Sequence, residues 1–153
     1  MNWVRKLKRF LNPPSPKPRM RKEKASPVSR IYDLQSIYQE INIEYFEGKL
    51  QLSIDWFGRE KTSRKISRKV LGYYDDRRKS IKIHRSLDSP SFPHFFLSYV
   101  VYHEMLHSVE PPIVGRKRRR VHHEGFRDKE KQFHSYAMAK QWEKEHLAKI
   151  LHG

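Results

Sequence analysis

The pattern of apolar and polar positions predicts one helix and three strands in the first half of the chain. Between residues 30 and 46 the apolar side chains recur at intervals of three and four, as on one face of a helix. Residues 50–56 alternate between apolar and polar, which is typical of a half-buried strand. Residues 70–74 and 80–84 predict two further strands, and the charged residues between them predict the turn of a hairpin.

The second half of the chain predicts two helices separated by a basic loop. Residues 94–109 are largely apolar, so they predict a buried helix, and Pro111 and Pro112 end it. Residues 115–120 follow as a predicted loop with five consecutive cations. A last helix is predicted from about residue 124 to about residue 149. Its expected inner face consists of Phe126, Phe133, Tyr136, Ala137 and Trp142.

The N-terminal residues differ in composition from the rest of the chain. Residues 2–11 combine helically spaced apolar side chains with four cations, and four prolines follow by residue 18. We therefore expect residues 1–28 to be a basic, Pro-rich tail, either disordered or a short amphipathic helix. At this length we expect residues 29–153 to form one folded domain. Within it, the polar and basic residues 58–69 predict a loop or the rim of a strand.

The charge balance limits the class of partner. Lys and Arg number 33 against 17 Asp and Glu, which gives a formal net charge of +16. A surplus of this size indicates a polyanionic partner, nucleic acid first and an anionic membrane second. The chain has no cysteine, so only histidines and carboxylates remain as strong metal ligands. Because no apolar run is long enough to span a bilayer and no signal peptide is visible, we expect a cytoplasmic protein.

The predicted buried helix contains the run His103-Glu104-Met105-Leu106-His107, an H-E-x-x-H motif. About 0.04 such runs are expected by chance in a chain of this composition. On a helix His103 and His107 lie one turn apart on the same face. Their imidazoles are then placed to bind one Zn²⁺, with Glu104 beside an open coordination position.

A catalytic zinc site of this kind needs a third protein ligand. The metzincin continuation would require glycine and histidine at positions that are Glu110 and Ile113 here, so that class is excluded. The downstream candidates are Glu110, His122, His123, Glu124 and Glu130. His122 and His123 stand four and three residues before Phe126, so either imidazole can face inward when that ring packs in the core.

Four stretches of the chain together resemble the SprT-like metallopeptidases, which include the Spartan proteases that cut proteins crosslinked to DNA. These stretches are Leu71-Gly72-Tyr73-Tyr74-Asp75, Ser80-Ile81-Lys82-Ile83-His84, His103-Glu104-Met105-Leu106-His107 and Val121-His122-His123-Glu124-Gly125-Phe126. The resemblance covers roughly residues 30–140 in the order of its elements. The Cys-rich zinc ribbon of several members has no counterpart here, since the chain has no cysteine.

The resemblance implies an α+β fold of the zincin-like minimal metallopeptidase type, with a small antiparallel or mixed sheet packed against helices. It implies one Zn²⁺ held by His103, His107 and His122, because the family's third ligand is a histidine four residues before an aromatic residue such as Phe126. It also implies that Glu104 acts as general base on a protein or peptide substrate. In this interpretation His123 is the alternative third ligand.

Three further expectations concern the surroundings of the motif. One sheet edge, residues 80–83, is expected to pair with the backbone of an extended peptide. Three tyrosines are either hydroxyl donors to the site or core packing, namely Tyr73, Tyr74 and Tyr102. DNA is expected to bind through the basic N-terminal tail and, beside the cleft, through five cations, namely Arg116, Lys117, Arg118, Arg119 and Arg120.

Two alternative functions stay open at this point. One is a metal-dependent endoribonuclease with three histidine ligands, and the other is a non-catalytic nucleic-acid-binding protein with a metal site. Such ribonucleases lack a glutamate after the first histidine of their motif, whereas Glu104 is present here. That residue therefore favours the peptidase.

Overall fold

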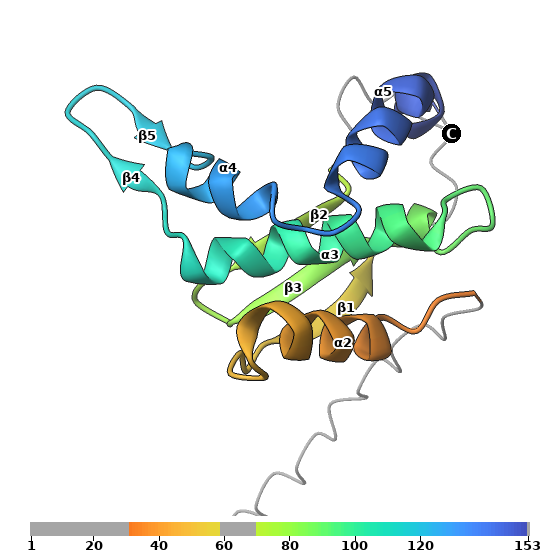
Figure 1. The fold of residues 1–153 in the computed structure, drawn as a ribbon, viewed down its shortest axis with the longest axis horizontal. Coiled ribbons are helices and arrows are strands. Elements are labelled where there is room, and N and C mark those ends of the chain that lie inside the picture. Colours follow the sequence, from red (N-terminus) through yellow and green to blue (C-terminus); the bar gives the residue numbers. More distant parts are fainter. Residues whose placement is uncertain (1–30, 59–69, 153) are drawn as a thin grey trace, which may run out of the picture.

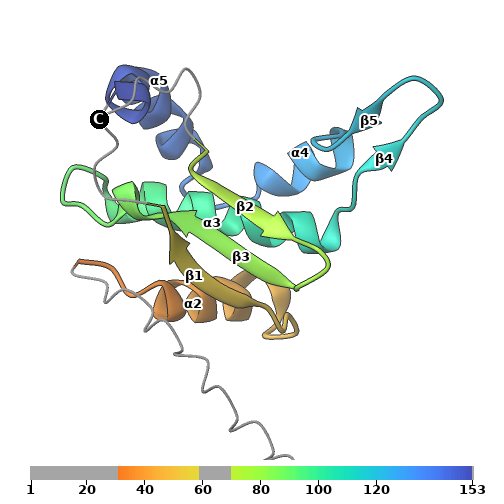
Figure 2. The ribbon, with the colours of Figure 1, turned by 180° about the vertical axis from the view of Figure 1, so that it is seen from behind.

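The computed structural model describes residues 31–58 and 70–152, which form a three-stranded sheet with helices packed along one face (Figures 1 and 2). This mixed arrangement confirms the predicted α+β class. The predictions for the N-terminal tail and for residues 59–69 lie outside the described residues. Within the described ranges no helix has both the length and the apolar character needed to cross a membrane.

Helix α2 (Leu34–Phe46) confirms the first predicted helix and has defined caps at both ends. The Asp33 carboxylate accepts hydrogen bonds from the N–H groups of Gln35 and Ser36, which satisfies two donors that the first turn leaves free. Glu47, at a φ of 55°, adopts the left-handed conformation that ends the helix. Its buried face packs on α3 and β1 and includes Leu34, Ile37, Tyr38 and Ile41.

The sheet has the order β1-β3-β2, with β1 (Ser53–Phe57), β2 (Gly72–Asp75) and β3 (Ser80–His84). Strand β3 runs antiparallel to β2, which confirms the predicted hairpin, and parallel to β1. Because β3 pairs with β1 on one edge and with β2 on the other, it occupies the centre of the sheet, where Ile81 and Ile83 are fully buried. The prediction that β3 offers a free edge to a peptide is therefore wrong. Strand β2 is the edge beside the H-E-x-x-H helix.

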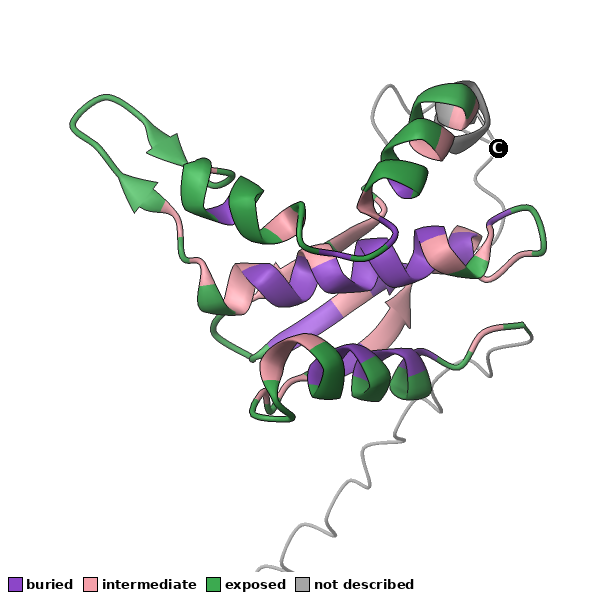
Figure 3. Ribbon diagram, viewed as in Figure 1, coloured by how far each residue is buried: buried purple, intermediate pink, exposed green. Residues whose placement is uncertain are grey.

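Helix α3 (His94–Val109) confirms the predicted buried helix and is the centre of the fold. It contacts β2, β3, α2, α4 and α5, so it is enclosed on most sides, as Figure 3 shows. Its fully buried side chains are Phe96, Leu97, Val101, Met105 and Leu106. Burial of each such side chain contributes about 1.5–3 kcal/mol, so the helix that carries the motif is held rigidly.

The predicted last helix is two helices, α4 (Glu124–Glu130) and α5 (Tyr136–His152), and the prediction of one continuous helix is wrong. The turn between them places Phe133 in the core, 5.0 Å from the ring of Tyr102. Burial of Phe133 therefore favours the break. In the expected inner face, Ala137 is exposed and Ala139 is buried in its place.

The basic segment also differs from its prediction, because it is an antiparallel hairpin and not an irregular loop. Its strands are β4 (Ile113–Val114) and β5 (Arg119–Arg120), paired Ile113 to Arg120 and Val114 to Arg119. The hairpin projects from the body of the molecule between α3 and α4 (Figure 1). All residues of both strands are exposed, so the backbone pairing does not depend on a buried core.

Candidate metal centre

Helix α3 presents the two motif histidines on one face. The rings of His103 and His107 lie 5.0 Å apart, as residues one helical turn apart should. Both are half-buried, whereas Glu104 is 7% exposed and lies against the sheet. The helix therefore fixes two imidazoles and one carboxylate before any other element is considered.

The segment between β5 and α4 brings His122 to the same point. Its Nε2 atom lies 3.1 Å from Nε2 of His103 and 3.3 Å from Nε2 of His107. The potential ligand atoms of the three histidines all lie within 4.8 Å of one another. Among the described residues, this is where three such side chains converge.

The spacing of these nitrogens fits a tetrahedral zinc ion. With Zn–N bonds of about 2.0–2.1 Å, two ligands of a tetrahedral site are about 3.3 Å apart. The observed Nε2–Nε2 separations of 3.1 and 3.3 Å match this distance between two ligand atoms. Three imidazoles are also a donor set that catalytic zinc uses when its fourth position stays open. The residues present therefore fit the metal that the motif implies.

The ring of Phe126 packs behind all three imidazoles. It is fully buried, and its centroid lies 5.0 Å from that of His103, 4.7 Å from His107 and 4.9 Å from His122. A rigid apolar ring at this position limits the rotation of each imidazole. Phe126 therefore aligns the side chains of two separate segments.

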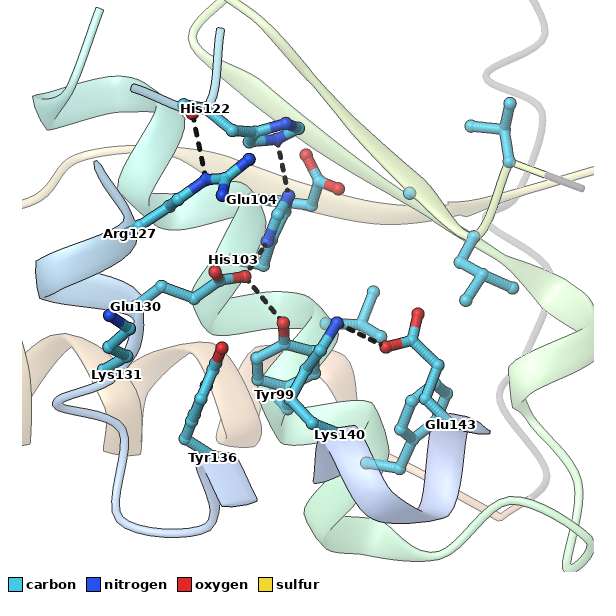
Figure 4. Close-up of a pocket in the computed structure, with 15 residues that line it drawn as sticks. Tyr99, His103, Glu104, His122, Arg127, Glu130, Lys131, Tyr136, Lys140 and Glu143 are labelled. Atoms are coloured by element: carbon cyan, nitrogen blue, oxygen red, sulfur yellow. Dashed lines mark hydrogen bonds and ion pairs between the residues drawn. The ribbon is translucent and has the colours of Figure 1, made fainter. Parts of the chain in front are cut away.

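A carboxylate orients His103 from the side opposite the cluster. Oε1 of Glu130 lies 2.7 Å from Nδ1 of His103 and accepts a 2.6 Å hydrogen bond from the hydroxyl of Tyr99 (Figure 4). With Nδ1 engaged by the carboxylate, Nε2 of His103 is free for a metal. Burial opposes ionisation of Glu130, but hydrogen bonds from His103 and Tyr99 outweigh it and lower the pKa of that carboxyl.

Helix α4 is fixed to the end of α3 by polar contacts as well as by Phe126. Lys129 forms an ion pair with Glu110, and the hydroxyl of Tyr102 donates a 2.7 Å hydrogen bond to the carbonyl of Lys129. These contacts hold α4 along α3, so that the residue preceding α4 reaches the motif. The Tyr102 hydroxyl is thus a packing anchor and not a donor to the site.

His123, the alternative third ligand, makes different contacts. It is the N-cap of α4, where Nδ1 accepts a hydrogen bond from the N–H of Phe126 at 3.3 Å. Its Nε2 lies 3.2 Å from the carbonyl oxygen of Pro111. Both ring nitrogens therefore face protein groups, whereas His122 faces the two motif histidines.

The other candidates for a third ligand are placed elsewhere. Glu110 pairs with Lys129, Glu124 is exposed in the first turn of α4, and Glu130 contacts His103. The role of Glu130 as the partner of His103 was not predicted. Its spacing in the sequence carries no signal for that contact, which depends on how α4 packs on α3.

Burial sets the protonation of the site. It raises the pKa of Glu104 to about 7, against a smaller opposing effect of His103. Burial, together with the charges of His103 and His122, lowers the pKa of His107 to about 4. Burial also lowers the pKa of His122 below its ordinary value. His107 and His122 are therefore neutral at neutral pH, which is the state that binds a metal.

Two cavities meet at the three histidines. The wide cavity, of about 610 Å³, lies between α3, α4, α5 and residues 70–72. The narrow cavity, of about 450 Å³, lies between β2 and the base of the basic hairpin. The residues that line both are Gly72, His103, Glu104 and His122. Together the two cavities form one cleft that runs past the histidine cluster.

In the described part of the chain, the edge of β2 that faces away from β3 has no partner strand, and this free edge follows the cleft. Leu71 accepts a 2.8 Å hydrogen bond from the N–H of His84, so its backbone faces β3. Because residues of an antiparallel strand alternate in direction, Gly72 and Tyr74 turn their N–H and C=O groups away from β3. Gly72 also lies over the motif, since a Cβ built there would be 3.1 Å from Cγ of Glu104. The unpaired backbone groups therefore begin beside the buried carboxylate.

The remaining predicted residues lie around the cleft. Tyr73 and Tyr74 line the narrow cavity, and the Tyr74 hydroxyl donates to Asp76 at 3.2 Å. The basic residues Arg116, Lys117, Arg118, Arg119 and Arg120 are all exposed on the hairpin. Of these, Arg119 lines the narrow cavity.

Comparisons with known proteins support the fold. No protein-family model and no curated protein matches the chain. Among solved structures, the metallopeptidase zymogen of Methanocaldococcus jannaschii jannalysin matches with a TM-score of 0.55 at 17% sequence identity. The match covers 78% of this chain and 98% of that chain. The predicted minimal metallopeptidase fold is therefore confirmed, and this similarity concerns the fold alone.

The different contacts of His122 and His123 lead to a first prediction. We expect His122→Asn to lose bound zinc, because it removes one of three converging imidazoles. We expect His123→Asn to keep about one zinc ion per chain, because asparagine caps a helix well and His123 faces the protein. Metal content is measured by mass spectrometry after reconstitution of metal-free protein. Loss of zinc in His123→Asn alone would contradict this assignment.

Proposed function

We propose that this protein is a zinc-dependent metallopeptidase of the SprT-like type, which hydrolyses peptide bonds with Glu104 as general base. The observation that carries the proposal is the convergence of three Nε2 atoms next to a buried glutamate, at the free edge of a strand. In this proposal His103, His107 and His122 hold the metal. The substrate is a protein or an extended peptide.

Each residue of the site then has a task. Zinc bound by the three histidines supplies a water of lowered pKa, about 7, and polarises the scissile carbonyl. Glu104 accepts the proton of the attacking water and passes it to the departing amine. Glu130 and Phe126 keep the imidazoles aligned.

Strand β2 positions the substrate. A peptide laid along its free edge can pair with the N–H and C=O groups of Gly72 and Tyr74. Gly72 lines both cavities together with Glu104, so pairing there brings a peptide bond to the carboxylate. RNA has no extended peptide backbone to pair along a strand edge, which favours the peptidase over the endoribonuclease.

Substitution of Glu104 tests the chemistry. We expect Glu104→Gln to lower kcat for casein or a fluorogenic peptide by about 10²–10⁴-fold, because the amide cannot accept the proton of water. Zinc content should stay at the wild-type value, since Glu104 is not a ligand. Chelation should abolish wild-type activity and added Zn²⁺ should restore it. Zinc-dependent cleavage of RNA but not of peptides would instead support the endoribonuclease.

The close approach of β2 to the motif gives a separate prediction. We expect Gly72→Ala to lower kcat by about ten- to a hundred-fold, because the added methyl group presses on Cγ of Glu104 at 3.1 Å and on Cδ1 of Ile83 at 3.1 Å. The control is Gly48→Ala, at a φ of 68° with no atom within 4 Å of the new Cβ. It should cost about 1 kcal/mol of stability and leave kcat unchanged below its Tm. Equal kcat in both variants would contradict the role of Gly72.

We also propose that the hairpin of β4 and β5 binds DNA, which would hold DNA-associated proteins next to the cleft. The five consecutive cations, residues 116–120, are exposed, and in the described part of the chain none forms an ion pair with an acidic side chain. A two-stranded ribbon has a width that the major groove admits.

Salt dependence tests the DNA proposal. We expect the triple variant Arg116→Gln, Arg118→Gln and Arg120→Gln to bind a 20-base-pair duplex more weakly. The slope of log affinity against log salt should fall by about 1 for each phosphate that the variant no longer binds. Fluorescence anisotropy at several salt concentrations measures both. Lys144→Gln, an exposed cation of α5, is the matched control. Weak wild-type binding without salt dependence would contradict DNA binding.

A further inference from the structure

Most of the charged side chains that line the wide cavity have no task in the proposed hydrolysis. Besides the metal-site residues and Glu104, it is lined by the ionisable side chains of Arg127, Glu130, Lys131, Lys140 and Glu143. They come from α4, from α5 and from the turn between them. Figure 4 shows α4 with Arg127 on one side of the cavity and α5 with Lys140 and Glu143 on the other.

The two carboxylates of this group are already engaged. Glu130 contacts His103 at 2.7 Å and accepts a hydrogen bond from Tyr99 at 2.6 Å. Glu143 accepts a 2.7 Å hydrogen bond from the Lys140 ammonium. Within the described ranges, neither carboxylate forms an ion pair with Arg127 or Lys131.

Two cations of the cavity have no acidic partner within the described ranges, namely Arg127 and Lys131. Lys131 is the C-cap of α4, and its N–H donates a 3.1 Å hydrogen bond to the carbonyl of Arg127, so it follows Arg127 by one helical turn. The Nε–H of Arg127 donates a 3.3 Å hydrogen bond to the carbonyl of His122, which holds the guanidinium beside the third imidazole. The two terminal amino groups of Arg127 remain available to a ligand.

The rest of the lining is apolar and aromatic. Val70, Leu71, Phe96 and Val100 line the cavity with the rings of Tyr99 and Tyr136. This surface suits the methylene groups of a side chain whose charged end reaches the cations. A guanidinium prefers the planar, two-oxygen geometry of a carboxylate, which it binds with two parallel hydrogen bonds.

We propose that the wide cavity is a subsite for a substrate carboxylate, which Arg127 and Lys131 bind next to the metal centre. The substrate is then a peptide with a carboxylate close to the scissile bond, either an acidic side chain or the C-terminus. This inference rests on the proposed peptidase function and adds to it the class of substrate.

Binding to an inactive enzyme tests the subsite without relying on turnover. Zinc-loaded Glu104→Gln is titrated with fluorescent decapeptides that carry one Glu or one Gln at each position in turn, with a free or an amidated C-terminus. We expect at least one Glu peptide, or the free C-terminus, to bind about tenfold more tightly than its neutral counterpart. Loss of affinity on amidation identifies the C-terminus, and loss on Glu→Gln exchange identifies the side chain.

Matched variants show where the preference arises. In the Glu104→Gln background, Arg127→Gln with Lys131→Gln should abolish the preference, and both sites are exposed, so folding and zinc content should be kept. Lys144→Gln should leave the preference unchanged. Equal binding of charged and neutral peptides, or a preference that survives in the double variant, would overturn the subsite. Binding of single-stranded DNA, but not of peptide, that depends on the two cations would also overturn it.

The wild-type enzyme separates this inference from the proposed function. Cleavage of casein without selective binding of acidic peptides would keep the peptidase and overturn the subsite. Selective binding that depends on Arg127 and Lys131, with no cleavage of any peptide, would support the subsite and contradict the peptidase.

Discussion

The packing of the Phe126 ring against three imidazoles is the contact on which the rest of the site depends. Two of those imidazoles belong to one rigid helix, and the third precedes a helix of only seven residues. So short a helix is not stable by itself in water and needs tertiary contacts to form. The buried ring supplies them, helped by Tyr102 and Glu110 at Lys129. Assembly of the metal centre and docking of α4 are therefore the same event.

The parts of the site that could be predicted from sequence are those fixed by local periodicity. His103 and His107 share a helical face at any position in a fold, so the motif and the apolar pattern around it were enough. The β2–β3 hairpin was equally local. The choice of His122 over His123 came from the resemblance to a family, because either residue can face Phe126 when only the spacing is known.

Long-range packing decided what could not be predicted. No glycine or proline marks the turn between α4 and α5, which depends on Phe133 entering the core. The position of β3 in the sheet depends on its parallel pairing with β1, from which it is separated in the sequence by β2. The contact between Glu130 and His103 joins residues 27 apart and exists only once α4 lies along α3. In each case the determining partner is remote in the chain.

The break between α4 and α5 separates two kinds of constraint. Helix α4 carries Phe126 and Glu130, which orient the histidines, so changes at these two positions act on the metal centre. Among its described side chains, helix α5 reaches the same cavity through Tyr136, Lys140 and Glu143, none of which pairs with an imidazole. Selection, or a protein engineer, can thus vary one wall of the cavity while the other stays constant. A scaffold of this size can acquire new recognition properties on α5 without rebuilding the centre beside it.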